Sequence, residues 1–309
     1  MTDIVPFSDE AIARAAALIR EGHPVAVPTE TVYGLAADAT NGAAVAAIYA
    51  AKGRPSFNPL IVHVPDAEAA AAIAVLEGPA RRLAEAFWPG PLTLVLPARE
   101  DGPVAALTRA GLPTVAVRAP AHRAMRALLA ASGRPLAAPS ANASGAISPT
   151  RAEHVARSLA GRIPLILDDG PCALGLESTI VRVMPDGLAL LRPGPISAEA
   201  LAEAAGPPII GAGEGIQAPG QLASHYAPDA PVRLDATERR AGEWLIGFGG
   251  VTGDDTLSAS GDLVEAAARL FDALHRADLS GRPIAIAPIP ETGLGQAIND
   301  RLSRAAAER

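Results

Sequence analysis

The chain has 309 residues and a formal net charge of −7, so it can bury a large core and form two domains, and it lacks the basic balance of a nucleic-acid binder. Aromatic residues make up 3% of the chain, which argues against a surface that stacks single-stranded bases. Cys172 is the single cysteine, which excludes an internal disulfide and fits a reducing cytoplasm.

The first helices can be placed from their end signals. Ser8 can cap a helix that ends before Gly22. Asn41 can cap a second helix that ends near Lys52 and Gly53. This places Lys52 in the last turn of that helix.

Short β runs alternate with helices over the first two thirds of the chain. The apolar run 60–64 predicts a buried strand with one polar residue, His63. Residues 150–153, Thr-Arg-Ala-Glu, match a capping box for a helix that ends at Gly161. Further helices are predicted at 66–76, 79–87 and 122–132. Further strands are predicted at 24–27, 92–96, 114–118, 136–138, 165–167, 178–183 and 188–191. Hairpin-like links and helical crossovers both occur, which predicts an α/β fold with a mixed sheet.

Residues 206–230 have a different composition, because glycine and proline crowd into one segment that is typical of a linker. After this segment, helices predicted at 262–278 and 294–306 alternate with strands. The strands are predicted at 231–234, 244–248 and 284–287. The alternation predicts a small parallel sheet. We therefore expect a first domain over 1–205, a linker over 206–230 and a second domain over 231–309.

We expect a cytoplasmic protein. The N-terminal residues lack the basic region and following apolar run of a signal peptide. No apolar stretch is long and uninterrupted enough to span a membrane.

The 26 cationic Lys and Arg residues include a single lysine, Lys52. An ammonium is a compact charge that reaches a phosphate oxygen without the planar fork of a guanidinium. One interpretation is a site where arginine cannot substitute, and the other is a surface lysine placed by chance. The polar and glycine residues around Lys52 favour the first.

Polar residues gather where several predicted β runs end, which is where α/β proteins bind ligands. They are Thr29, Glu30, Thr31, Tyr33, Lys52, Arg54, Asn58, His63, Thr114, Arg118, Ser140, Asn142, Glu177, Ser178, Thr179 and Arg192. Cations with hydroxyl and amide donors suit a polyphosphate beside a carboxylate. Singly, each has an ordinary interpretation, such as a core histidine for His63 or a helix cap for Thr150. Their joint occurrence favours a site.

Other nucleotide and metal motifs do not occur in the sequence. No glycine-rich loop ends in Gly-Lys-Ser/Thr, and the glycine-rich residues 247–253 miss the dinucleotide-binding spacing by one residue, so they predict a turn. The six histidines have no metal-ligand spacing. The pair Asp168-Asp169 before Gly170 is more typical of a turn than of a Mg²⁺ site. We expect no metal bound by the protein itself.

Five short motifs occur together in the first two thirds of the chain. They are Pro28-Thr29-Glu30-Thr31-Val32-Tyr33-Gly34-Leu35, Lys52-Gly53-Arg54, Asn58-Pro59-Leu60, Ser140-Ala141-Asn142 and Leu191-Arg192-Pro193-Gly194. Together they resemble the YrdC-like threonylcarbamoyl-AMP synthases over about residues 8–200. His225-Tyr226-Ala227-Pro228 and residues 293–302 resemble the linker and C-terminal domain of the long form of that family.

The resemblance implies a twisted mixed sheet with a concave cavity, followed by a small Rossmann-like domain. It implies that L-threonine, bicarbonate and ATP, with Mg²⁺ carried by ATP, give L-threonylcarbamoyladenylate and pyrophosphate, a nucleotidyltransferase reaction. The product would serve threonylcarbamoyladenosine modification of tRNAs reading codons that start with A. A separate tRNA threonylcarbamoyltransferase would use it, so we expect no stable nucleic-acid binding and no membrane contact.

The family's motifs also imply residue roles. The threonine-binding residues would be Thr31, His63, Arg118, Ser140 and Ser178. The ATP-binding residues would be Lys52, Arg54, Asn58, Thr114, Asn142, Thr150, Arg192 and Tyr226. Lys52, Arg54, Ser140 and Asn142 would be catalytic through positioning and charge neutralisation rather than as nucleophiles. Ser224 precedes His225 where the family often has a basic residue, which leaves open whether the linker contacts the triphosphate.

Two other interpretations belong to different classes. A double-stranded RNA binder would use the same cavity, and salt-dependent RNA binding without ATP turnover would favour it. A carbamoyltransferase domain of the hydrogenase-maturation type shares the fold, but such chains carry zinc-binding cysteine pairs, which one cysteine cannot form.

Overall fold

The structure, a computed structural model, describes residues 2–211, 217–221 and 224–307. The strands of its large sheet are β1 (Asp3–Pro6), β2 (Val25–Pro28), β3 (Tyr33–Asp38), β4 (Ile61–His63), β5 (Leu92–Pro97), β6 (Thr114–Arg118), β7 (Leu136–Ala137), β8 (Leu165–Asp168), β9 (Thr179–Met184), β10 (Gly187–Arg192) and β11 (Ile209–Ile210). The strands of its small sheet are β12 (Val232–Arg233), β13 (Trp244–Gly247), β14 (Asp255–Thr256) and β15 (Ile284–Ile286). The helices are α1 (Asp9–Arg20), α2 (Gly42–Lys52), α3 (Ala67–Ala71), α4 (Gly78–Phe87), α5 (Arg123–Ser132), α6 (Ala152–Leu159), α7 (Ala198–Ala205), α8 (Leu263–Leu279), α9 (Leu294–Ala306) and the 3₁₀ turn η1 (Ala106–Arg109).

The large sheet is mixed, as predicted, and has the order β1-β8-β2-β3-β7-β4-β6-β5-β9-β10-β11. Parallel pairs such as β4–β6 alternate with antiparallel pairs such as β5–β6. The small sheet has the order β12-β15-β13-β14, and its strand pairs are parallel, as predicted. The predicted linker is not wholly a connection, because β11 within it pairs with β10 and extends the large sheet.

The predicted helix starts are confirmed at two of three places. The Ser8 hydroxyl accepts the Ala11 N–H, and the Asn41 side chain accepts from Ala43 and Ala44. Helix α2 ends at Lys52, because Gly53 takes a left-handed conformation, with φ of +60°, that favours glycine.

The predicted capping box at residues 150–153 does not form. Arg151 is the residue that precedes α6, and its side chain makes no cap hydrogen bond. His154 takes the reciprocal role instead, since its Nδ1 accepts the Thr150 N–H at 3.3 Å. The predicted helix 66–76 is also too long, because after α3 the chain turns and Ala74 bridges to Ala98.

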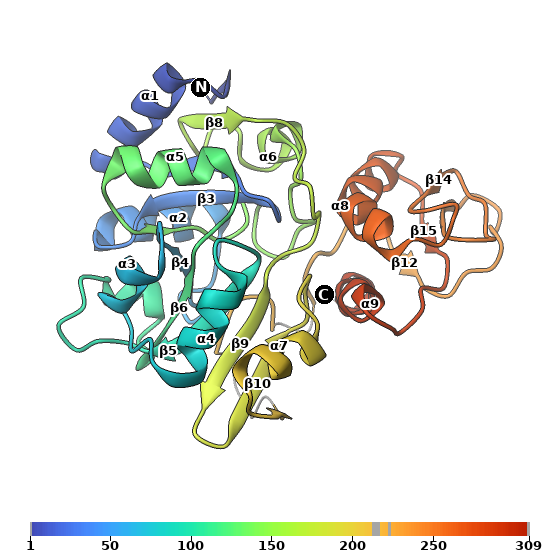
Figure 1. Cartoon of the computed structure of the whole chain (residues 1–309). Helices are drawn as coiled ribbons and strands as arrows, with labels where there is room; N and C mark the ends of the chain where they lie inside the picture. Colours follow the sequence, from blue (N-terminus) through green and yellow to red (C-terminus); the bar gives the residue numbers. More distant parts are fainter. Residues whose placement is uncertain (1, 212–216, 222–223, 308–309) are drawn as a thin grey trace.

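Helices cover the two faces of the large sheet unequally. In β2, Val25 and Val27 pack on one face with α1 and α5, whereas Ala26 packs on the opposite face with α2. Burial on both faces explains why β2 reads as a continuous apolar run. On that face, α1 and α5 lie over β8, β2 and β3 (Figure 1).

Along β4, β6 and β10 the same face carries small and medium apolar side chains, among them Ile61, Ala116 and Ala189. Ala218, from the segment after β11, is fully buried against them. The polar residues His63 and Arg118 follow Ile61 and Ala116 by two positions, so they lie on that face too. The segment after β11 therefore covers this part of the face, which also carries His63 and Arg118.

The second domain packs tightly on the first. Figure 1 shows α8 and α9 on the side of the small sheet that faces the large one. One apolar cluster joins Val32, Ile147 and Leu176 of the first domain to the α8 and α9 side chains. Gly175 brings its main chain so close to α8 that a Cβ there would lie 2.5 Å from the Ala267 carbonyl oxygen. The interface is thus part of the core.

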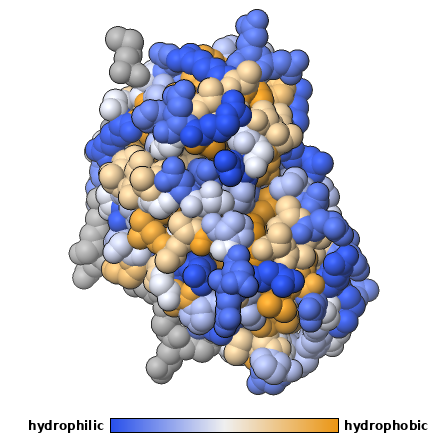
Figure 2. Space-filling model, turned by 90° about the vertical axis from the view of Figure 1, so that its left-hand side faces the viewer, coloured by the Kyte–Doolittle hydropathy of each residue, from blue (hydrophilic) through white to orange (hydrophobic). Residues whose placement is uncertain are grey.

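The outer surface has no single broad apolar area on the face that Figure 2 shows. Hydrophobic residues there stand in separate groups among hydrophilic ones, as on ordinary protein surfaces. Within the described residues, no helix has the length and apolar character that crossing a membrane requires.

Candidate active site

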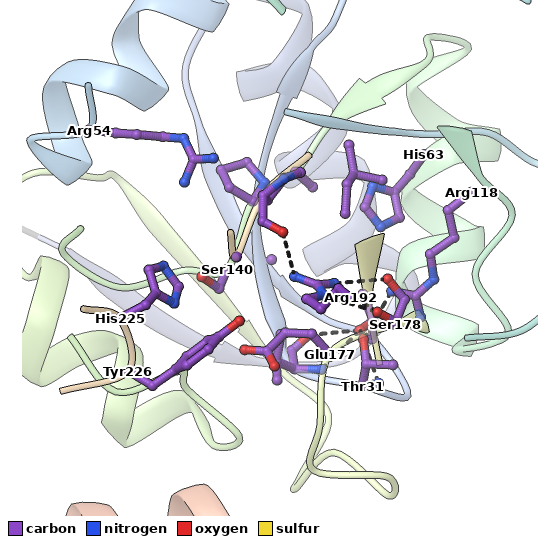
Figure 3. A pocket seen from close by; sticks show the side chains of 18 residues that line it. Thr31, Arg54, His63, Arg118, Ser140, Glu177, Ser178, Arg192, His225 and Tyr226 are labelled. Atoms are coloured by element: carbon purple, nitrogen blue, oxygen red, sulfur yellow. Dashed lines mark hydrogen bonds between the residues drawn. The ribbon is translucent and has the colours of Figure 1, made fainter. Parts of the chain in front are cut away.

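A cavity opens on the sheet face that carries His63 and Arg118, and it collects polar side chains from distant parts of the chain (Figure 3). It is lined by Thr29, Thr31, Val32, Gly34, Arg54, Ile61, His63, Arg118, Ala138, Pro139, Ser140, Glu177, Ser178, Arg192, Pro219, Gly220, His225 and Tyr226. Of the predicted site residues, the structure brings together here Thr31, Arg54, His63, Arg118, Ser140, Ser178, Arg192 and Tyr226.

Arg118 organises one end of the cavity from the last position of β6. Its Nη2 lies 2.7 Å from a Glu30 carboxylate oxygen, and its Nη1 donates to the Thr31 hydroxyl at 3.0 Å. Burial alone would raise the pKa of Glu30, but the Arg118 guanidinium and main-chain hydrogen bonds together keep this pKa below its ordinary value. Glu30 is therefore ionised, and Arg118 is held in one orientation.

His63 stands beside Arg118 at the end of β4, where His63 and Arg118 are register partners. Burial, with a smaller contribution from Arg118, lowers the pKa of His63 to about 3. Its Nδ1 is buried and has no hydrogen-bond partner within the described chain. His63 is thus a neutral imidazole that offers a polar atom to a ligand.

Arg192 supplies a second buried guanidinium, from the end of β10. It donates to the Ser178 carbonyl oxygen at 3.0 Å and to the Ser178 hydroxyl at 3.1 Å. That hydroxyl is also 2.7 Å from Thr93 Oγ1. Burial lowers the pKa of Arg192, but an arginine remains charged at neutral pH.

Arg54 supplies a third cation, from the loop after α2. Its Nε and Nη2 donate to the carbonyl oxygens of Asn58 and Pro59, at 3.1 and 2.9 Å. The loop 54–59 therefore folds around its own guanidinium. Burial lowers the pKa of Arg54 to about 10, so the group is cationic at neutral pH.

Lys52 does not line the cavity. Its side chain is 3% exposed, and its ammonium donates to the main-chain carbonyl oxygens of Ser140 and Asn142. Burial, and next the charge of Arg54, lower the pKa of Lys52 well below its ordinary value. The interpretation of Lys52 as a surface charge is therefore wrong, and its contacts are with the loop that carries Ser140.

Four other predicted residues also lie outside the cavity lining. Thr114 begins β6 on the same face as Arg118, four residues or about 13 Å from it. Thr150 contacts His154, next to α6. Asn58 and Asn142 are buried, and their side-chain oxygens have no partner among the described residues. A buried polar atom without a partner costs free energy. Both side chains would therefore suit a polar ligand that extends beyond the cavity lining.

The segment after β11 closes the cavity with Pro219, Gly220, His225 and Tyr226. Tyr226 has a positive φ of 61°, which is uncommon outside glycine. Its hydroxyl and the Nδ1 of His225 are buried without a partner in the described chain. Gly220 packs so closely that a Cβ would lie 2.8 Å from Arg192 Cδ and 2.9 Å from the Tyr226 hydroxyl. These residues form a lid over the basic groups.

Glu177, His225 and Thr29 also line the cavity, although no threonine- or ATP-binding role was predicted for them from the sequence. Glu177 belongs to the polar cluster Glu177-Ser178-Thr179, and His225 precedes Tyr226 in a quoted motif, so both signals were present. Thr29 holds the turn before β3, since its hydroxyl lies 2.7 Å from Thr31 Oγ1 and donates to the Val32 carbonyl oxygen.

Two predicted turns are confirmed. The Asp168 carboxylate accepts the Gly170 N–H at 3.0 Å and the Tyr33 hydroxyl at 3.2 Å, as a turn-forming aspartate does. The glycine-rich residues 247–253 form a tight turn in which Phe248 bridges to Val251.

In residues 2–211, 217–221 and 224–307, no three His, Cys, Asp or Glu side chains gather as metal ligands.

Comparisons with known proteins agree with this architecture. A family model described as "Telomere recombination" (Sua5_yciO_yrdC) matches residues 17–194, and one described as "Threonylcarbamoyl-AMP synthase, C-terminal domain" matches residues 196–307. A threonylcarbamoyl-AMP synthase of Bacillus subtilis is 44% identical over 100% of this chain and 96% of its own.

Solved structures match as well. The crystal structure of Pyrococcus abyssi Sua5 complexed with L-threonine superposes with a TM-score of 0.90 at 39% identity, covering 99% of this chain and 98% of that one. The crystal structure of Escherichia coli YciO matches with a TM-score of 0.57 at 19% identity over 65% of this chain and 100% of that one, which supports the fold alone. The chain belongs to the Sua5/YrdC family of threonylcarbamoyl-AMP synthases, in its two-domain form.

Proposed function

We propose that this protein makes L-threonylcarbamoyladenylate and pyrophosphate from L-threonine, bicarbonate and ATP. The observation that carries the proposal is the set of buried arginines, Arg54, Arg118 and Arg192, around one cavity that also holds five hydroxyl side chains, those of Thr29, Thr31, Ser140, Ser178 and Tyr226. Such a site suits a substrate with a carboxylate, a hydroxyl and several phosphate oxygens.

Threonine would bind at the Arg118 end. Arg118 would face its carboxylate, while Thr31, Ser140 and Ser178 offer hydroxyls and His63 a neutral ring nitrogen. The Pyrococcus abyssi relative was crystallised in complex with L-threonine, which supports threonine as a ligand of this family. Glu30 already shares the Arg118 guanidinium, so Arg118 would reach threonine with its remaining donors.

ATP would bind between the other two arginines and the lid. Arg54 and Arg192 would neutralise phosphate charge, and Tyr226, Asn58 and Asn142 would use their unpaired polar atoms. Thr114 lies along β6 and would be reached only by the far end of an extended ligand. Lys52 would act from behind, by fixing the loop that carries Ser140 and Asn142.

The reaction would need no protein nucleophile. The threonine nitrogen would bond to the carbon of bicarbonate, with loss of water, or to that of carbon dioxide, with loss of a proton, and give a carbamate. A carbamate oxygen would then form a bond to the α-phosphorus while the bond to the bridging oxygen of pyrophosphate breaks. The fixed arginines would stabilise the phosphate charge, and the lid residues would keep water from the adenylate.

Mg²⁺ would arrive with ATP rather than on protein ligands. Of the lining residues in the described part of the chain, Glu177 is the single acid, and both of its oxygens accept hydrogen bonds. Mg²⁺ commonly keeps waters and binds through substrate phosphates, which fits a cavity of this composition.

In the cell, the product would serve threonylcarbamoyladenosine formation on tRNAs reading codons that start with A. A separate tRNA threonylcarbamoyltransferase in the cytoplasm would use it. The net charge of −7 supports a protein that does not hold tRNA itself, and the match over the whole chain favours the synthase over the RNA-binding and carbamoyltransferase alternatives.

The test is pyrophosphate release by the full chain with ATP and Mg²⁺, in which threonine and bicarbonate are omitted in turn. We expect release to depend on both. Release that is indifferent to either substrate would contradict the proposal, and so would salt-dependent binding of double-stranded RNA without turnover.

A further inference from the structure

Arg301 lies on α9 of the second domain and reaches across the domain interface to the cavity wall. It is 0% exposed. Its Nε donates to Glu177 Oε2 at 2.9 Å, and its Nη1 donates to the Pro193 carbonyl oxygen and to Asp300 Oδ2, each at 2.8 Å. It also lies over the ring of Tyr226, 5.5 Å from the centroid.

Glu177 is the reason that this contact matters for the cavity. It is a carboxylate, 5% exposed, in the wall of a cavity that the three arginines make suitable for anions. Ser148 donates to Glu177 Oε1 and Arg301 to Oε2, so both oxygens are occupied from the side away from a ligand. Burial alone would raise the pKa of Glu177, but Arg301 and then Arg192 outweigh burial and keep it below its ordinary value.

We propose that Arg301 is a positioning residue, through which the second domain neutralises Glu177 and so keeps Arg192 available for an anionic ligand. The assignment of Arg192 to phosphate rests on the proposed function. Arg192 and Glu177 both line the cavity, and Arg192 donates to the carbonyl oxygen and the hydroxyl of Ser178, the residue after Glu177. Without Arg301, the Glu177 carboxylate would keep the Ser148 hydroxyl but lose its cationic partner, so its charge would attract Arg192 and repel the ligand.

This role differs from simple adhesion between the domains. Arg301 donates to Glu177 in the cavity wall and to Pro193, the residue after Arg192. The pair Arg151–Asp272 also crosses the interface, but it is partly exposed and neither of its residues lines the cavity. An exposed pair contributes little to stability. Arg151→Ala is therefore the matched control for losing an interdomain arginine.

The experiment measures binding of inorganic pyrophosphate to the full chain by calorimetry, so that it does not depend on turnover. We expect Arg301→Gln to weaken binding by about 10- to 100-fold, the size of an unpaired charge near the ligand. The pyrophosphate affinity of Arg301→Lys should lie between that of Arg301→Gln and that of the wild type. Arg151→Ala should bind pyrophosphate like the wild type. Glu177→Gln should not weaken binding, because it removes the repelling charge.

The double variant Glu177→Gln/Arg301→Gln decides between the roles. Charge compensation predicts binding within about threefold of the wild type, since the carboxylate that needs neutralising is gone. A purely structural role predicts that the double variant binds as weakly as Arg301→Gln, and that Glu177→Gln weakens binding too. If Arg301→Gln does not fold, the folded double variant still gives the answer by the same criterion.

The outcomes separate the two proposals. Wild-type protein that binds pyrophosphate but does not turn over threonine, bicarbonate and ATP contradicts the proposed function alone. Arg301→Gln that binds as well as the wild type overturns the role of Arg301 alone. No pyrophosphate binding by the wild type would overturn both.

Discussion

The ammonium of Lys52 donates a hydrogen bond to the main-chain carbonyl oxygen of Ser140, so the last residue of α2 holds a loop that lies 88 residues further along the chain. The same ammonium reaches the Asn142 carbonyl oxygen. Ser140 faces the cavity, whereas Lys52 does not. The single lysine thus acts on the site from behind its wall.

Lys52→Met should therefore damage both stability and substrate binding. It leaves the Asn142 carbonyl oxygen without the Lys52 donor, whereas the Ser140 carbonyl oxygen still accepts the Asn142 N–H at 3.0 Å. The loss costs about 2 kcal/mol in the free energy of unfolding. It also releases the Ser140 loop, so the KM for threonine should rise several-fold. Urea unfolding and pyrophosphate release measure the two effects.

The matched control for Lys52→Met is Arg20→Met. Arg20 also ends a helix and donates to a carbonyl oxygen, that of Ala131, but the contact is exposed. Arg20→Met should change the free energy of unfolding by less than about 0.5 kcal/mol. Equal urea midpoints and equal KM values for the two variants would remove Lys52 from the account of the site.

Amine labelling gives a second prediction from the same contact. Apart from the α-amino group, the chain has one primary amine, that of Lys52. Because this amine is 3% exposed, we expect a lysine-reactive reagent to modify only the N-terminus of the folded protein, with or without ATP. Mass spectrometry should find Lys52 modified only in denaturant. Fast labelling of Lys52 in the native protein, slowed by ATP, would instead mean that the ammonium faces the nucleotide.

Much of the architecture follows from local sequence signals. The caps Ser8 and Asn41, the glycine after Lys52 and the alternation of the last third each depend on neighbouring residues, and the structure confirms them. The capping box failed because two overlapping starts are possible, and His154 rather than Glu153 reaches back to the main chain. Local patterns do not decide between starts that differ by one residue.

The site residues gathered in the cavity were predicted because they end β runs or belong to motifs that resemble a family. The orientation of Lys52 was not predictable, since a helix-end lysine can point to a ligand or to a loop. Nor was the pair Glu177–Arg301, whose members are 124 residues apart and meet only when two domains pack. Pattern reasoning finds polar positions, whereas the partner of a buried charge depends on tertiary packing.

Amino-acid selectivity tests the hydroxyl-rich end of the cavity. Thr31 and Ser178 present hydroxyls there beside Arg118. A site that hydrogen-bonds a substrate hydroxyl rejects the analogue without it, by as much as about 10⁴-fold. Valine has the shape of threonine without the hydroxyl, so it should release almost no pyrophosphate, and serine should be a weak substrate. Similar kcat/KM values for valine and threonine would contradict a hydroxyl-specific site.

Acid sensitivity tests the neutral state of the buried histidines. His275 stacks on His154 across the domain interface at 3.8 Å, and burial, then the charge of His154, lower the pKa of His275 to about 3. The unfolded chain binds a proton on this ring near pH 6.5. Between pH 6.5 and 3 the unfolded state therefore binds more protons than the folded state, and stability falls as the pH falls.

We expect the Tm of the wild type to drop between pH 7.5 and pH 5, and the Tm of His275→Gln to drop less over the same range. His275 is partly exposed, so solvent reduces its contribution to about 1 kcal/mol at pH 5, or about 2–4 °C in Tm. The comparison uses the change with pH within each variant, because the substitution itself also alters stability. His23→Gln, which removes an exposed histidine of the first domain, should keep the full wild-type drop. If His275→Gln loses as much Tm as the wild type over this range, His275 is not the group that takes up the proton when the chain unfolds.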